Sequence, residues 1–148
     1  MVKSMAEGTG RMAVVLPQGA LFRRGAEGSI RQKLLEMDLV EAVIGLAPNL
    51  FYGAGLAACI LMLRKKKLAS RRKKVMIADA SGLFQRGRAR NYLEPEHALE
   101  IQGWFEKYAD VQGAVRVVGI DELNDLPAKA GRLSWRGINP RLKRFAAD

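Results

Sequence analysis

Five short apolar runs, separated by glycine, proline and charged residues, most strongly constrain the fold of this chain. They lie at residues 12–16 (MAVVL), 39–46 (LVEAVIGL), 57–63 (AACILML), 75–78 (VMIA) and 114–120 (AVRVVGI). Each run has the length of a strand and is bounded by turn-forming or charged residues, which predicts strands. The near-continuous apolar character of the first three runs indicates that both of their faces are buried.

Two further segments have the apolar spacing of amphipathic helices. The first, near residues 27–37, is expected to turn an apolar stripe to the core and charged side chains to solvent. That stripe comprises Ala26, Ile30, Leu34 and Met37, and the charged face comprises Arg31, Lys33 and Glu36. The second, residues 94–109, has Pro95 in its first turn and a stripe of Ala98, Ile101, Phe105 and Tyr108.

The connections between the runs predict the topology. A strand, a helix and a strand at the start favour a parallel crossover between residues 12–16 and 39–46. No helix separates residues 39–46 from 57–63, so these strands are expected to be antiparallel neighbours in a wide hairpin. The predicted fold class is therefore α/β, the closing half of an open, mostly parallel sheet with one antiparallel strand. Antiparallel pairing of residues 75–78 with 57–63 would return the chain to the edge where 39–46 ends.

Composition excludes several kinds of site. Among the 148 residues, the single cysteine (Cys59) excludes a disulfide framework, and the single histidine (His97) excludes a pair of histidine metal ligands. Cys59 lies inside an apolar run and is expected in the core, whereas His97 falls in the first turn of a predicted helix and is expected to be structural. No apolar stretch approaches the roughly 20 residues that span a bilayer, and no signal peptide is evident, so we expect a cytoplasmic protein.

The net charge of +10 is concentrated in one segment. Residues 64–90 hold 11 basic residues and a single acid, Asp79, whereas the rest of the chain is balanced. A localised excess of this kind is typical of a protein that binds a polyanion such as nucleic acid. A solvated turn that only keeps the protein soluble would have the same composition, and the sequence leaves both interpretations open.

Two glycine-rich segments have the spacing of a cofactor-binding loop, at residues 8–13 (GTGRMA) and 53–58 (GAGLAA). Such a loop follows a strand and opens a helix, because the helix N-terminus and its free N–H groups bind the phosphate or ribose side of the cofactor. Both segments lead into a predicted strand instead. Neither is therefore assigned to a cofactor, and no residue of the chain is assigned a catalytic or metal-ligating role.

Several blocks of sequence together resemble one protein family. They are VVLPQGALFR at residues 14–23, AVIGLAPNLFYGAG at 42–55 continuing into ACIL at 58–61, VMIADAS at 75–81, RNYL at 90–93 and NPR at 139–141. In order and spacing they resemble the C-terminal half of the catalytic domain in the modification subunit of type I restriction–modification systems. The resemblance implies one partial domain over residues 1–148, with a mostly irregular basic tail at 121–148.

The family resemblance implies a chemistry that this chain covers only in part. It implies a DNA adenine-N6 methyltransferase with a Rossmann-like sheet, S-adenosylmethionine as methyl donor, and specificity and restriction subunits as partners. The family's glycine loop and its catalytic Asn-Pro-Pro-aromatic tetrapeptide are both missing from residues 1–148. The chain is therefore expected to bind no S-adenosylmethionine and to be inactive on its own.

The resemblance also implies where a flipped adenine would be held. Phe51 or Tyr52 would stack on the base, and Asn49 would shape the loop that carries them. Strand direction would bring five arginines to the same edge as candidates for DNA phosphate contacts, namely Arg23, Arg24, Arg86, Arg88 and Arg90. The lysine-rich run at residues 64–74 would lie at the opposite edge.

Two further expectations complete the predictions from sequence. The alternative to an enzyme fragment is a small non-enzymatic module that binds nucleic acid or a partner protein through its basic surface. An incomplete sheet would also expose an apolar edge, which predicts that the fragment associates with itself.

Overall fold

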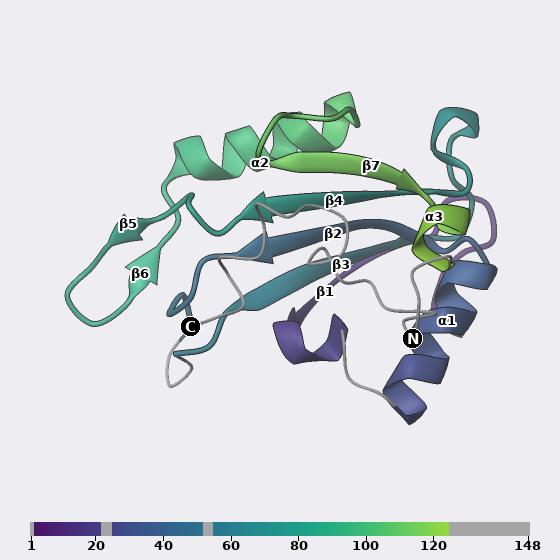
Figure 1. Ribbon diagram of the computed structural model, residues 1–148, viewed down its shortest axis with the longest axis horizontal. Coiled ribbons are helices and arrows are strands. Elements are labelled where there is room, and N and C mark those ends of the chain that lie inside the picture. The colour runs from purple at the N-terminus through teal and green to yellow at the C-terminus, as the bar shows by residue number, and fades with distance from the viewer. Residues whose placement is uncertain (1, 22–24, 52–54, 125–148) are drawn as a thin grey trace.

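The computed structural model describes residues 2–21, 25–51 and 55–124, which form one five-stranded sheet with helices on both faces (Figure 1). The strands of this sheet are β1 (Arg11–Pro17), β2 (Val40–Leu46), β3 (Ala58–Arg64), β4 (Lys74–Ala80) and β7 (Val115–Gly119). A separate two-stranded hairpin consists of β5 (Gln85–Arg86) and β6 (Asn91–Tyr92). The helices are α1 (Ala26–Glu36), α2 (Pro95–Lys107) and α3 (Ile120–Asn124), with short 3-10 turns η1 (Val2–Ser4), η2 (Gln18–Leu21) and η3 (Ala69–Arg71).

The strand order is β1-β3-β2-β4-β7. β3 lies between β1 and β2 and is antiparallel to both, so β1 and β2 run in the same direction, as the predicted crossover requires. The α/β class and the antiparallel β2–β3 pair are confirmed, and β7 is a second reversed strand, antiparallel to β4. The predicted pairing of residues 75–78 with β3 is wrong, because both edges of β3 are already occupied. β4 instead pairs parallel with β2 and ends at the same edge.

The sheet separates two apolar cores. One core contains Leu35 of α1 and Leu123 of α3 with one face of the strands. The other face is covered by α2, whose Ile101, Trp104 and Phe105 pack against the buried strand residues. Every residue of the central strand β2 is buried, as its continuous apolar sequence predicts. The same prediction is wrong for β1, an edge strand whose residues alternate between exposed and half-buried.

The predicted inner face of α1 is wrong in part: Leu34 packs against the core as predicted, but the rest of the apolar stripe does not. Ile30 and Met37 are 58% and 61% exposed, whereas Arg31 is buried along with Leu35. The Arg31 guanidinium donates a hydrogen bond of 2.6 Å from Nη1 to the carbonyl oxygen of Ala20, so this charged side chain has a polar partner inside. Apolar spacing alone therefore selected the wrong side of the helix, since it cannot show a backbone acceptor in a distant turn.

Helix α2 is stabilised at both ends. Pro95 occupies the first turn, and Glu94 and His97 form a reciprocal capping box in which the N–H of Glu94 donates to Nδ1 of His97 at 3.0 Å. The structural role predicted for His97 is confirmed. At the other end Tyr108 adopts a left-handed conformation (φ 47°) and closes the helix by donating from its N–H to the carbonyl of Trp104.

Several expectations fall partly or wholly outside the described residues. Of the predicted tail at residues 121–148, the structure describes the end of α3 only, so the NPR motif at 139–141 lies outside it. Arg23, Arg24 and Tyr52 also lie outside the described residues. In the part of the chain that is described, no helix has the length and apolar character to cross a membrane.

Candidate nucleic-acid interface

The loop that follows β2 presents an aromatic side chain at the carboxyl edge of the sheet. Pro48 and Asn49 are exposed and Asn49 is left-handed (φ 58°), a conformation that asparagine adopts more readily than most residues. The next side chain, Leu50, is buried in the core under α2, which anchors the loop. Phe51 then emerges and is 42% exposed. The buried leucine and the left-handed turn together direct Phe51 away from the core.

A small basic hairpin lies beside this loop (Figure 1). β5 and β6 are joined by a tight turn in which the N–H of Gly87 donates to the carbonyl oxygen of Arg90 at 3.1 Å. A Cβ atom at position 87 would overlap that oxygen and press on the ring of Tyr92, so the turn requires glycine. Residues 85–92 contain three arginines and no acid. The sequence reasoning missed these strands because each has only two residues.

The hairpin is bonded directly to the aromatic loop. Asn91 donates from its backbone N–H to the carbonyl oxygen of Asn49 at 2.8 Å and from its side-chain Nδ2 to that of Pro48 at 2.8 Å. Arg90 adds a longer contact of 3.5 Å from Nη1 to the carbonyl oxygen of Leu50. Residues about 40 positions apart in sequence therefore form one continuous surface.

We call this area the hairpin–loop surface and define it by Phe51, Arg86, Arg88, Arg90 and Tyr92. All five side chains are exposed. Among the residues that the structure describes, Arg86 and Arg88 form no ion pair, and their guanidinium groups are available to a ligand. Arginine next to exposed aromatic rings suits a polyanion with flat bases, because it offers both charge and stacking.

The end of β4 completes this edge of the sheet. Ala80 pairs with Leu46, so β4 and β2 end side by side. Asp79, the single acid of the basic segment, accepts hydrogen bonds from the N–H of Ser81 at 3.0 Å and from its hydroxyl group. Its carboxylate therefore stabilises the turn that leads from β4 toward the hairpin.

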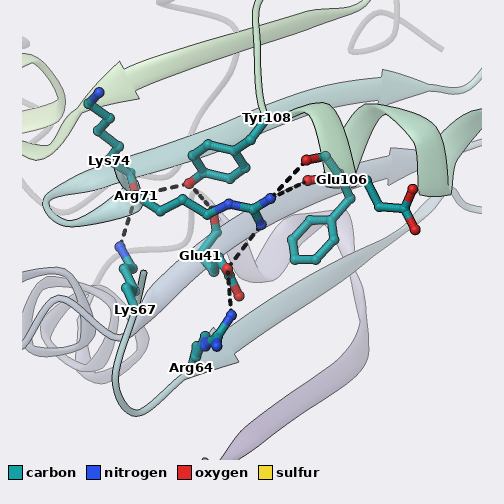
Figure 2. A network of polar contacts seen from close by, with 8 residues as sticks. Glu41, Arg64, Lys67, Arg71, Lys74, Glu106 and Tyr108 are labelled. Carbon is teal, nitrogen blue, oxygen red and sulfur yellow. Dashed lines mark hydrogen bonds and ion pairs between the residues drawn. The ribbon is translucent and has the colours of Figure 1, made fainter. Parts of the chain in front are cut away.

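The lysine-rich run lies at the opposite edge, as strand direction predicts. Arg64 ends β3 opposite Arg11, the first residue of β1. Much of the run is bonded internally rather than offered to solvent (Figure 2). Lys67 is buried, and its ammonium group contacts Asp38 at 2.6 Å and the carbonyl oxygen of Lys74 at 2.8 Å. This part of the basic segment stabilises the fold, which neither interpretation of the sequence included.

Arg71 is the centre of the network at this edge. Its Nη1 contacts the buried carboxylate of Glu41 at 3.1 Å, and its Nη2 donates to the carbonyl oxygens of Phe105 and Glu106 at the end of α2 (Figure 2). The guanidinium also lies 4.3 Å from the ring centroid of Tyr108. One arginine thus neutralises a buried charge on β2 and attaches the last turn of α2 to the sheet.

The shifted ionisable groups of this structure are buried and away from the hairpin–loop surface. Burial raises the pKa of Tyr108, and the negative charge of Glu41 raises it further; its hydroxyl group donates to the carbonyl oxygen of Glu41 at 2.6 Å. Burial likewise raises the pKa of the Cys59 thiol to about 11, although a backbone contact with Leu16 opposes it. Both groups stay protonated at neutral pH, which suits packing rather than nucleophilic chemistry.

Of the sequence-predicted site residues, the structure brings together Asn49, Phe51, Arg86, Arg88 and Arg90 at one edge. Tyr92 and Asn91 join them and were not assigned a role from sequence. The signal available in the sequence was the block RNYL, which contains both. Within the described residues no group of three or more His, Cys, Asp and Glu side chains could hold a metal ion.

A comparison with known protein families shows which family the chain belongs to. The family described as N-6 DNA Methylase matches residues 1–127. The chain belongs to this family. This match confirms the resemblance seen in the sequence blocks. Members of the family are S-adenosylmethionine-dependent methyltransferases.

Individual relatives are named as subunits of restriction enzymes. The chain is 35% identical over 116 residues to the type I restriction enzyme MjaVII methylase subunit of Methanocaldococcus jannaschii, a match that covers 76% of this chain and 20% of the relative. It is 30% identical over 116 residues to the MpnII methylase subunit of Mycoplasma pneumoniae, covering 78% of this chain and 21% of the relative. The chain spans about a fifth of the length of these curated relatives.

Solved structures agree with the fold. The methyltransferase subunit of a type I restriction–modification system from Streptococcus thermophilus superposes with a TM-score of 0.80 at 29% identity, over 95% of this chain and 28% of that one. The EcoKI M protein, at 18% identity and a TM-score of 0.64, supports the fold alone.

The two glycine-rich segments do not fit a loop that binds the methyl donor. The glycine segment at residues 8–13 runs directly into β1, and Gly10 is packed against the backbone of Ala6. The second segment, at residues 53–58, leads into β3, although residues 53 and 54 lie outside the described part. Neither segment opens a helix, so neither provides the free N–H groups of a helix N-terminus.

Proposed function

We propose that this chain is part of the modification subunit of a type I restriction–modification system, a DNA adenine-N6 methyltransferase. The full-length subunit would transfer a methyl group from S-adenosylmethionine to a flipped adenine in the cytoplasm, with specificity and restriction subunits as partners. Within it, the hairpin–loop surface contacts DNA beside the flipped base. The donor and the catalytic tetrapeptide would be supplied by parts of the subunit outside this chain, which is inactive alone.

The observation that carries this proposal is the exposed Phe51 on a loop that is bonded to the hairpin of Arg86 and Arg88. A flipped base loses the stacking of the duplex, and an aromatic face returns about 1–3 kcal/mol of it. We infer that Arg86 and Arg88 bind phosphates of the DNA, with Arg90, Arg23 and Arg24 as further candidates. Tyr52, beside Phe51 in sequence, is the other candidate for stacking.

The stacking role is tested in the full-length subunit assembled with its partners. Phe51→Ala is expected to lower kcat/KM for methyl transfer about 5- to 150-fold, the factor that corresponds to 1–3 kcal/mol. Leu99→Ala, which removes an exposed apolar side chain from the outer face of α2, is the matched control. Equal activity of the Phe51→Ala and wild-type subunits would exclude Phe51 as a base contact.

The phosphate role is tested by the salt dependence of DNA binding. Replacing Arg86 and Arg88 by glutamine is expected to reduce the slope of log K against log salt concentration by about 0.9 for each phosphate that is no longer neutralised. Lys66→Gln with Arg72→Gln removes two exposed charges from the opposite edge and should leave the slope unchanged. If both pairs of substitutions reduce the slope equally, the net charge of the protein affects DNA binding and no phosphate contact can be assigned to Arg86 and Arg88.

The non-enzymatic module is not favoured, because the family match covers most of the chain. Self-association is a separate proposal and rests on β1. Among the described residues no strand pairs with its outer edge, and on one face of β1 the apolar side chain of Val15 is 53% exposed. A monomeric mass in solution at high protein concentration would contradict it.

A further inference from the structure

Asn91 donates two hydrogen bonds from the basic hairpin to the aromatic loop. Its backbone N–H and its side-chain amide donate to two successive carbonyl oxygens, those of Asn49 and Pro48, each at 2.8 Å. Within the hairpin its strand partner is Arg86. A single residue of β6 therefore lies opposite a candidate phosphate ligand and holds the loop that carries the candidate base contact.

The loop depends on such support at this position. Asn49 is left-handed, a conformation that a residue with a Cβ atom adopts only at a cost in free energy. Its side chain is exposed and is not buried against the core, so the turn is held by the two hydrogen bonds from Asn91, the longer contact from Arg90 to the carbonyl oxygen of Leu50, and the burial of Leu50. The direction in which Phe51 leaves the turn follows from the orientation of these peptide groups.

We propose that Asn91 is a positioning residue that couples DNA binding by the hairpin to base capture by the loop. This inference rests on the proposed function. When Arg86 and Arg88 bind phosphates, the hairpin is fixed relative to the DNA backbone. The two hydrogen bonds of Asn91 then fix the loop, and with it Phe51, relative to the same backbone. The aromatic ring is thereby held where the base arrives, so the loop loses less conformational freedom when it binds the base.

The experiment uses the full-length subunit in complex with its partners and a duplex with 2-aminopurine in place of the target adenine. The fluorescence of 2-aminopurine rises when the base leaves the stack, so it reports the equilibrium between stacked and flipped states. Asn91→Leu, close in size, and Asn91→Ala both remove the side-chain donor and keep the backbone N–H. We expect a fall of about fivefold in the flipping equilibrium constant, the factor for one ordinary hydrogen bond.

A purely structural or a direct DNA-binding role would give different results. The salt slope of binding is expected to stay at the wild-type value in both Asn91 variants, whereas Arg88→Gln lowers it. Gln85→Ala removes an exposed amide from the same hairpin and should change neither measurement. If the Asn91 variants flatten the slope as Arg88→Gln does, Asn91 itself contacts DNA and the positioning role is overturned.

Phe51→Ala, measured in parallel, separates the two proposals. A lower flipping constant in Phe51→Ala, with wild-type values in both Asn91 variants, overturns the coupling and leaves the proposed function standing. A wild-type value in Phe51→Ala overturns the base contact itself, and the coupling with it. Lower values in all three variants, with an unchanged salt slope for Asn91, support both.

Discussion

Removing the guanidinium of Arg71 is expected to destabilise the fold more than any other single change in the basic run. Arg71→Met leaves the carboxylate of Glu41, whose side chain is 3% exposed, with Arg64 at 3.7 Å as its remaining ion-pair partner among the described residues. It also removes the donors to the carbonyl oxygens of Phe105 and Glu106 at the end of α2.

The magnitude follows from the burial of this pair. Breaking a buried ion pair by removing one partner costs about 3–5 kcal/mol, because the remaining charge stays desolvated. With a dependence on urea of about 2 kcal/mol per molar for a protein of this size, the unfolding midpoint should fall by about 2 M. Lys66→Met, an exposed residue of the same run, should change the free energy of unfolding by no more than about 0.5 kcal/mol.

The assay is urea unfolding followed by circular dichroism, with a third variant to identify the cause. Glu41→Leu combined with Arg71→Met removes the buried carboxylate together with the guanidinium of Arg71 and leaves Arg64 without its partner at 3.7 Å, so it should recover part of the loss. The reasoning is refuted if Arg71→Met costs no more than Lys66→Met, or if the double variant is as unstable as the single one. If Arg71→Met costs no more than Lys66→Met, the network around Arg71 does not stabilise the fold. If the double variant is as unstable as Arg71→Met, the buried charge of Glu41 is not the cause of the instability.

Two further predictions concern the thiol in β3 and the turn of the hairpin. Burial raises the pKa of Cys59 from 9.0 to about 11, so the protonated thiol stabilises the folded state below pH 9, and this contribution is lost as the pH rises toward 11. Urea unfolding between pH 8 and 11 should therefore show a smaller decline for Cys59→Ala than for the wild type, and equal declines would contradict the assignment. Gly87→Val should open the hairpin, because the Cβ of the new side chain overlaps the carbonyl oxygen of Arg90. Trypsin should then cleave near Arg88 faster in this variant than in the Gly82→Ala control, where the added Cβ meets nothing within 4 Å.

Much of the sheet could be predicted because its strands are apolar in themselves. The run at residues 39–46 is hydrophobic along almost its whole length, and β2 is buried on both faces. The missing helix between β2 and β3 correctly predicted the antiparallel pair. The two helices near residues 27–37 and 94–109 were found at nearly the observed bounds, and Pro95 marked the start of α2.

The sequence predicted several residues of the candidate site but not the hydrogen bonds that join them. Phe51 and Arg88 were placed at one edge from strand direction alone, and the structure brings the loop and the hairpin together there. The hydrogen bonds through Asn91 could not be predicted, because they join groups about 40 residues apart in segments with no periodic pattern. Arg31 shows the same limit, since the carbonyl that draws it into the core belongs to another turn.

The sequence by itself determined the alternation of strands and helices, the reversed third strand and the family of the chain. These are properties of local hydrophobic spacing and of the lengths of the connections, which each segment carries along its own length. Only the tertiary structure decided which charged side chains bond within the fold and which are exposed to a ligand. Lys67 and Arg71 cannot be told from Arg86 and Arg88 by residue type, because the difference lies in the distant carboxylates and carbonyl oxygens that folding brings within about 3 Å of the first pair.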